Sequence, residues 1–89
     1  MFYCYVLKSE RTGRRYVGSC EDLEARLDRH NLAKVPATRH GTPWIILHRE
    51  IFDTRNQAIT RELYYKTRRG RDELDRITRP IAAATFPAS

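Results

Sequence analysis

Four side chains in the first third of the sequence have the types and the spacing needed to act on a phosphate ester. Tyr5 and Tyr16 are eleven residues apart and lie in two short apolar runs. Arg26 follows Tyr16 by ten residues, and His30 follows Arg26 by four. The four side chains can converge on one surface if the two runs form a hairpin that leads into a helix. Such a group can orient a phosphodiester and neutralise the charge that develops during its hydrolysis.

Local patterns predict the elements that would bring these residues together. Residues 2–8 are rich in aromatic and β-branched side chains, which is typical of a strand. Polar and glycine turn signals over residues 9–14 separate this strand from a second, shorter one over residues 15–18. The two strands are expected to pair in antiparallel fashion.

A first helix is predicted over residues 21–31, with Leu23 and Leu27 as its apolar stripe. Ser19, with Asp22 three residues later, resembles an N-cap arrangement for this helix. Gly18 is expected to let the chain turn from the second strand into the helix.

The second half of the sequence predicts one strand and two helices. Pro36, Gly41 and Pro43 indicate a basic loop over residues 32–43, and the apolar run that follows predicts a central buried strand over residues 44–51.

Thr54 and Gln57 match a capping box for a helix over residues 55–68, and Gly70 is expected to stop it. The expected inward-facing residues of that helix are Ala58, Ile59, Leu63 and Tyr64. A short third helix is predicted over residues 71–78, with Leu74 and Ile77 inward.

These elements give the order β-β-α-β-α-α, which predicts an α+β fold with a small three-stranded, at least partly antiparallel sheet flanked by helices. A length of 89 residues indicates one domain, expected over residues 1–80, with a short C-terminal tail over residues 81–89.

Composition points to a polyanionic partner. The formal net charge is +6 and the sequence pI is about 9.8, as expected of a small domain that binds nucleic acid.

Cys4 and Cys20 are not part of a CxxC pair and are interpreted as small buried hydrophobic residues, although their number also permits one disulfide. No apolar run has the length of a membrane span, and no signal peptide precedes the first strand, so a cytoplasmic location without membrane contact is expected.

Taken together, these positions resemble the GIY-YIG nuclease family, in its small stand-alone bacterial form. Tyr3-Cys4-Tyr5 stands where the first family motif ends in tyrosine, and Tyr16-Val17-Gly18 stands where the second begins with it. Residues 16–27 are similar to the strand-to-helix signature of the family, and their spacing reaches the position of its catalytic arginine. The resemblance covers residues 1 to about 80. It implies a catalytic group consisting of Tyr5, Tyr16, Arg26, His30 and Glu62.

The resemblance implies a metal-dependent endonuclease acting on DNA, in single-stranded, duplex or branched form, as a monomer or weak dimer. Tyr16 would be the general base, Arg26 would stabilise the transition state, and Glu62 would bind one divalent cation, Mg²⁺ or Mn²⁺. Tyr5 would position water or phosphate, and His30 would assist Tyr16 or bind the substrate. A tyrosine hydroxyl normally has a pKa of about 10 and can act as a base near neutral pH only if a nearby cation or hydrogen bond favours the phenolate.

Several basic residues are candidates for contacts with the phosphate backbone: Lys34, Arg39, His40 and Lys66. Such contacts would give salt-dependent binding without sequence preference. One position departs from the family pattern, because Arg79 stands where many members carry an asparagine.

Each assignment has a structural alternative. Tyr5 could be a packing residue of its strand, Arg26 a solvated helix residue, His30 a residue at the end of its helix, and Glu62 the ion-pair partner of Lys66. Two other functional classes also remain. A binding module that keeps the fold and the basic surface would bind nucleic acid without turnover, and a protein-interaction adaptor would bind no nucleic acid.

Overall fold

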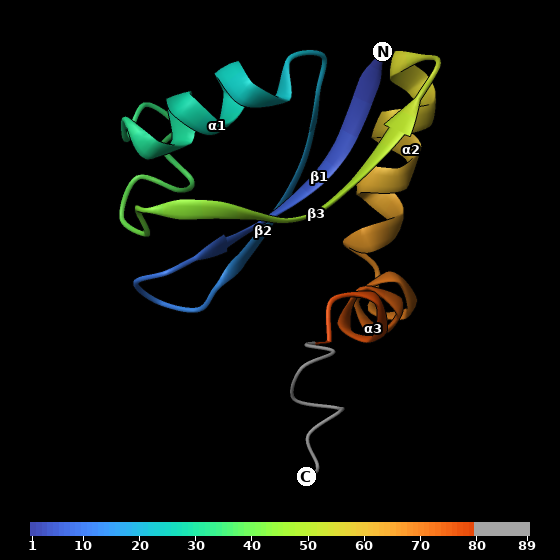
Figure 1. Cartoon of the computed structure of the whole chain (residues 1–89). Coiled ribbons are helices and arrows are strands. Elements are labelled where there is room, and N and C mark those ends of the chain that lie inside the picture. Colours follow the sequence, from blue (N-terminus) through green and yellow to red (C-terminus); the bar gives the residue numbers. More distant parts are fainter. Residues whose placement is uncertain (80–89) are drawn as a thin grey trace, which may run out of the picture.

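The computed structural model describes residues 1–79 and shows six elements in the predicted order (Figure 1). The strands and helices are, in chain order, β1 (Phe2–Ser9), β2 (Arg15–Cys20), α1 (Leu23–Asn31), β3 (Trp44–Phe52), α2 (Arg55–Tyr65) and α3 (Arg68–Ile77). The fold class is α+β, as the sequence predicts. The expected tail over residues 81–89 lies outside the described residues.

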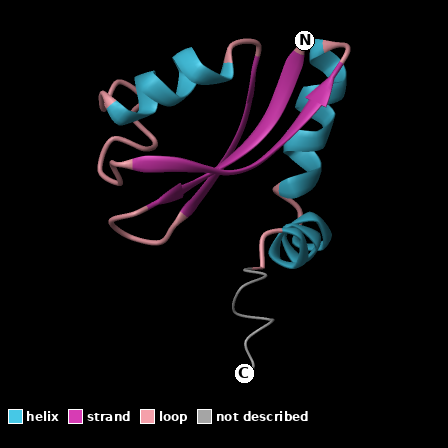
Figure 2. Cartoon of the chain, in the orientation of Figure 1, coloured by secondary structure: helices cyan, strands magenta, loops and turns pink. Residues whose placement is uncertain are grey.

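The sheet is fully antiparallel and has the strand order β2-β1-β3 (Figure 2). The centre of the sheet is therefore β1, in which Cys4, Tyr5, Val6 and Leu7 are all buried because both faces of this strand are covered. The prediction of a central buried β3 is wrong. This strand forms an edge, and its isoleucine side chains are exposed.

Helices cover both faces of the sheet (Figure 1). On one face, Leu23 and Leu27 of α1 pack with Tyr5, Leu7 and other apolar side chains, as their four-residue spacing predicts. The other face carries α2 and α3, which contribute Tyr65 and Leu74 to a second cluster. Alternation along a strand sends neighbouring side chains to opposite faces, so each strand feeds both clusters. The molecule is a sheet between two helical layers, with two cores.

The first residue of each helix is set by a capping side chain that accepts a hydrogen bond from a backbone N–H of the first turn. The predicted capping box of α2 is confirmed, because Thr54 accepts from the Gln57 backbone N–H and the Gln57 side chain accepts from the Thr54 backbone N–H. For α1 the predicted cap is wrong. Asp22 is the N-cap and accepts from the Ala25 N–H at 3.0 Å, so the helix starts two residues later than predicted. Ser19 remains in β2, where its hydroxyl donates to the Glu62 carboxylate.

A sharp corner separates α2 from α3 and corrects two predicted boundaries. The second helix ends at Tyr65, and Thr67 caps a new helix by accepting from the Gly70 backbone N–H at 3.0 Å. Gly70 therefore lies inside the first turn of α3 rather than beyond the end of α2. A Cβ atom at Gly70 would collide with the backbone carbonyl of Tyr64. Glycine is required because the two helix backbones approach each other closely.

The inward face of α2 also differs from the expected one. Ala58 and Tyr65 are buried, whereas Ile59 and Leu63 are exposed. Partners from other elements draw Arg61 inward. Its guanidinium donates to carboxylates of β3 and α3 and lies over two tyrosine rings; these contacts involve Glu50 (2.9 Å), Glu73 (2.9 Å), Tyr64 and Tyr65. This network ties α2, α3 and β3 together. In α3, Leu74 is buried as predicted, but Ile77 is exposed.

The two cysteines are free and buried. Cys4 belongs to the cluster under α2 and α3, and Cys20 belongs to the cluster under α1, so they lie on opposite faces of the sheet. Burial is the main cause that raises the pKa of the Cys4 thiol to about 12. Within residues 1–79, the helices are too short and too polar to cross a bilayer.

Candidate active site

The β1–β2 hairpin brings the two motif tyrosines together. Tyr5 is opposite Gly18 and Leu7 is opposite Tyr16, so both tyrosine side chains project from the face that α1 covers. The centroids of the two rings are 6.4 Å apart. An eleven-residue separation therefore becomes a contact because the turn reverses the chain between them.

A buried hydrogen-bond chain starts at Tyr5. Its hydroxyl lies 3.0 Å from His30 Nε2, and His30 Nδ1 lies 2.7 Å from the Thr38 hydroxyl. The exposed fractions of Tyr5, His30 and Thr38 are 1%, 0% and 1%, so the chain is closed to solvent. The chain connects β1, α1 and the loop before β3. Tyr5 therefore holds His30 directly, and its hydroxyl does not reach the molecular surface.

His30 in turn supports Tyr16. The centroids of the two rings are 5.0 Å apart, and Tyr16 is half-buried at the margin of the core. Burial lowers the pKa of His30, and the positive charges of Arg26 and Arg29 lower it further. Burial likewise raises the pKa of the Tyr5 hydroxyl. Both groups are thus neutral near pH 7, which fits a positioning role for the pair.

Gly18 is needed for this packing rather than for the turn into α1. It lies within β2, and a Cβ atom placed there would be 2.5 Å from the Tyr5 hydroxyl oxygen and 3.1 Å from the Tyr16 ring. Any side chain at this position would separate the two tyrosines. The glycine of the second motif is therefore a spacer that lets Tyr5 cross beneath β2 to reach His30.

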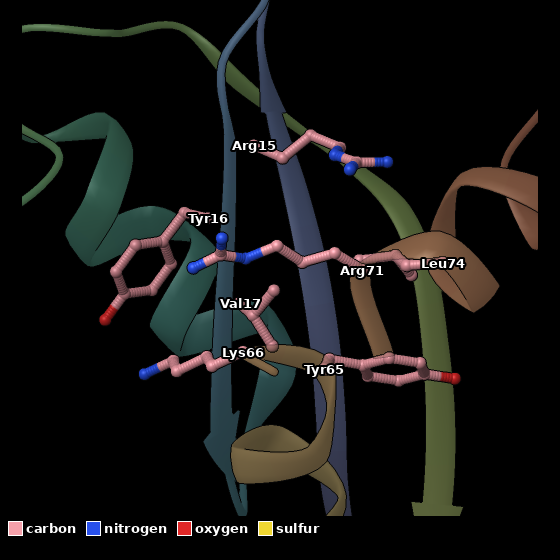
Figure 3. A pocket seen from close by; sticks show the side chains of 7 residues that line it. All are labelled: Arg15, Tyr16, Val17, Tyr65, Lys66, Arg71 and Leu74. Carbon is pink, nitrogen blue, oxygen red and sulfur yellow. The ribbon is translucent and has the colours of Figure 1, made fainter. Parts of the chain in front are cut away.

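Tyr16 also lines an open cavity of about 280 Å³ between β2, the end of α2 and the start of α3. Figure 3 shows its hydroxyl on the same side as the Lys66 ammonium and the Arg71 guanidinium. The cavity is lined by Arg15, Tyr16, Val17, Tyr65, Lys66, Arg71 and Leu74. Its charged side chains are all cationic, which suits an anionic ligand.

Arg26 lies on the half-exposed side of α1 and lines a second cavity, of about 320 Å³, at the other end of β2. Ser19, Arg29 and Arg55 line the same cavity, and so do the acidic residues Glu21 and Asp22. The two cavities follow one another along the outer edge of β2, at residues 15–17 and at residues 19–20. Given the rise of a strand, they are on the order of 10 Å apart.

Glu62 approaches β2 from the opposite helical layer. Its Oε1 accepts from the Ser19 hydroxyl at 2.7 Å, and its Oε2 accepts from the Lys66 ammonium at 2.8 Å. The ion pair with Lys66 that the sequence offered as an alternative is therefore present. The Glu62 side chain keeps 20% of its surface exposed.

The remaining basic candidates lie elsewhere. Lys34 and Arg39 are exposed in the loop after α1, and Arg39 Nε lies 3.3 Å from His40 Nε2. His40 lines a separate cavity of about 350 Å³ with Arg14, at the tip of the hairpin. Of the four predicted phosphate-contacting residues, only Lys66 borders the Tyr16 cavity.

Three residues of this region were not singled out as site residues by sequence reasoning. Arg71 borders the Tyr16 cavity from α3, Ser19 positions Glu62, and Thr38 holds His30. A capping signal at Thr67 was present in the sequence and would have moved the start of α3 ahead of Arg71. The local pattern at Ser19 suggested a helix cap instead, and Thr38 showed no local signal, because neither has its side-chain partner among its nearest neighbours in the sequence.

The chain is an α+β domain with a three-stranded antiparallel sheet and paired motif tyrosines. The family model for the GIY-YIG catalytic domain matches residues 1–75. The chain belongs to the GIY-YIG family.

Several relatives show where in the family the chain lies. The UPF0213 protein SSP2268 of Staphylococcus saprophyticus is 33% identical over 66 residues, which are 73% of this chain and 79% of that protein. The UPF0213 protein SpyM50708 of Streptococcus pyogenes is 36% identical over 73 residues, which are 80% of this chain and 77% of that protein. The solution NMR structure of UPF0213 protein BH0048 from Bacillus halodurans shares the fold, with a TM-score of 0.56, 24% identity and coverage of 100% and 99% of the two chains.

A longer relative carries the name of an enzyme. The structure-specific endonuclease subunit slx1 of Schizosaccharomyces pombe is 46% identical over 52 residues, which are 51% of this chain and 19% of that protein. Together with the catalytic-domain match, this similarity supports a nuclease. Nucleases of the GIY-YIG family generally depend on a divalent metal ion.

The buried His30 predicts a distinct loss of stability in mild acid. Its pKa is below the ordinary value of 6.5 in the folded protein, so the unfolded chain binds a proton that the folded protein excludes. The free energy of unfolding should therefore fall as the pH drops below about 6.5, by at most about 1.4 kcal/mol per pH unit. Glu50 and Glu73, whose pKa values are lowered by hydrogen bonds, add to the loss only below their ordinary value of 4.5.

Urea unfolding at several pH values between about 7 and about 5 measures this effect. His30→Gln should lower the overall stability but flatten the pH dependence in this window. Equal slopes in the parent protein and in His30→Gln would contradict the assignment.

Proposed function

We propose that this chain is a metal-dependent endonuclease that hydrolyses phosphodiester bonds in DNA. The observation that carries the proposal is the arrangement along the outer edge of β2. Tyr16 and Arg26 reach this edge from the hairpin and α1, and Glu62 reaches it from α2 through its bond to Ser19. An edge strand leaves room for an extended substrate to pass between the two helical layers. The family match and the similarity to slx1 support the same class of reaction.

In the proposed mechanism, each residue has one task. Tyr16 accepts the proton of the attacking water as a general base. Arg26 presents its planar guanidinium to two phosphate oxygens and stabilises the charge of the transition state. Tyr5 and His30 are positioning residues, because they are buried and hold the ring of Tyr16 in place. Gly18 allows this packing.

Glu62 is the residue that would hold the divalent cation. No group of three or more histidine, cysteine, aspartate or glutamate side chains within residues 1–79 forms a ready cation site. A single carboxylate fits Mg²⁺, which commonly takes one or two carboxylates together with waters and substrate oxygens. The Glu62 carboxylate already pairs with the Lys66 ammonium at 2.8 Å, so a bound cation would share it with Lys66 or displace that ammonium. The ion, when bound, would neutralise charge on the phosphate.

A cleavage assay on labelled single-stranded, duplex and branched DNA, with Mg²⁺ or Mn²⁺, tests the proposal. Glu62→Gln should raise the metal concentration needed for half-maximal rate by at least the roughly 10–100-fold that outer-shell changes cause at metal sites. The amide oxygen can still accept from Ser19, so the fold should be kept. Glu10→Gln, which changes an exposed glutamate in the hairpin turn, is the matched control. Salt-sensitive DNA binding without cleavage in either metal would favour the non-catalytic module instead.

A further inference from the structure

The cavity beside Tyr16 contains cationic side chains to which the proposed mechanism gives no task. Arg15, Lys66 and Arg71 bring three positive charges to it from three different elements, and no acidic side chain lines it. Val17 and Leu74 give it an apolar floor. Attraction between charges is stronger beside apolar surface than in open water. A volume of about 280 Å³ is at the lower limit for a small-ligand pocket, which suits a single anionic group.

The three cations are not equivalent. Arg15 pairs with Asp75 at 2.5 Å, and Lys66 pairs with Glu62 at 2.8 Å. The ion pairs within residues 1–79 do not include Arg71. Figure 3 shows the Arg71 side chain extending from α3 across the cavity, with its guanidinium toward Tyr16, while the Arg15 guanidinium turns toward α3. Arg71 therefore offers an uncompensated charge next to the candidate general base.

The position of Arg71 follows from the corner between α2 and α3. Gly70 allows the two helices to approach closely, and the Thr67 cap starts α3 so that Arg71 lies in its first turn. The contacts of Arg61 with Glu50 and Glu73 hold α3 from its other side. The guanidinium of Arg71 is thus carried by a fixed element rather than by a loop.

We propose that this cavity is a second phosphate subsite, in which Arg71, with Lys66, binds a phosphate of the same nucleic-acid strand next to the one that is cleaved. The proposal rests on the proposed function for the identity of the ligand. The cavity of Arg26 and the cavity of Arg71 follow one another along β2, so one strand lying along this edge can contact both. A planar guanidinium can donate two hydrogen bonds to a phosphate, which a lysine ammonium does with less directional control.

The test is equilibrium binding of a fluorescently labelled single-stranded oligonucleotide in EDTA, over a series of KCl concentrations, so that cleavage plays no part. Arg71→Gln should weaken binding about tenfold at moderate salt. It should also reduce the slope of log K against log salt by about 0.7, as expected for one lost phosphate contact on a single strand.

Arg69→Gln is the matched control, because it removes the same charge from the same turn of α3 but lines a different cavity with Glu73 and Arg76. It should change the affinity and the slope by less than half as much. Equal effects of the two substitutions would overturn the subsite and leave only a general attraction of charges. A parent protein that binds no oligonucleotide would overturn it as well. If Arg71→Gln weakens binding more than Arg69→Gln, as predicted, but the parent protein never cleaves DNA, the nuclease proposal is wrong and the phosphate subsite stands.

Discussion

Replacing Arg26 with alanine is expected to lower kcat for DNA cleavage by about 10²–10³-fold, which corresponds to about 2.7–4 kcal/mol of transition-state stabilisation. Arg26 is half-exposed on α1 and is not among the buried residues that form the core. Its removal should therefore leave the fold intact. Single-turnover cleavage by the parent protein and the variant measures the loss, and circular dichroism confirms that both are folded.

Two further variants distinguish the role of this guanidinium from that of its charge. Arg26→Lys should recover only part of the rate, because an ammonium cannot present a planar fork to two oxygens. Arg49→Ala, on the opposite edge strand, removes a surface arginine of the sheet and should cut at the parental rate. If Arg26→Ala cleaved as fast as the parent protein, the mechanism proposed above would be wrong.

Replacing Gly70 with alanine should destabilise the protein by about 3 kcal/mol, the upper part of the usual range for overpacking. In an unrestricted helix the same change would stabilise by about 0.5–1 kcal/mol, so the sign of the effect is diagnostic. The new methyl group would meet the backbone carbonyl of Tyr64, which cannot move aside as a flexible side chain would. For a domain of this size, each kcal/mol lowers Tm by about 4–8 °C, which thermal unfolding detects easily.

Gly13 provides the contrast for this prediction. It has a φ of 78° and open space around its Cα, so Gly13→Ala should cost only the backbone strain, about 1–2 kcal/mol. Asparagine tolerates that conformation and should recover part of the loss at position 13. At position 70 asparagine should be no better than alanine, because there the obstacle is space. A stabilised Gly70→Ala variant would show that the corner is not closely packed.

The sequence determined the kinds of elements better than their arrangement. Two apolar runs, residues 3–7 and residues 44–47, look alike as buried strands, and periodicity does not tell which one lies between two neighbours. The structure places the first in the centre and the second at an edge. Arg61 and Glu62 face inward on α2 because Glu50, Glu73 and Ser19 provide their partners. Such pairings join distant segments and leave no local pattern.

The candidate site also contains residues that local spacing could group and residues that it could not. Tyr5, Tyr16, Arg26 and His30 could be grouped from spacing, because one hairpin and the helix after it are local structures. Glu62 was reached through the resemblance to a family rather than through spacing. Arg71 was missed because its place depends on the corner at Gly70, which the sequence presented as a helix end.

The outer edge of β2 has one more consequence, which concerns association between molecules. An edge strand presents unpaired backbone groups that another strand can join, and charged side chains at the edge discourage such pairing. Along β2 the charges come from Arg15 in the strand and from Lys66 and Arg71 in the helices beside it. The positive charges that would bind a phosphate backbone thus also protect this edge from β-sheet aggregation. A nucleic-acid strand forms no β-sheet hydrogen bonds with the backbone of β2, so these charges do not keep it from lying along the same edge.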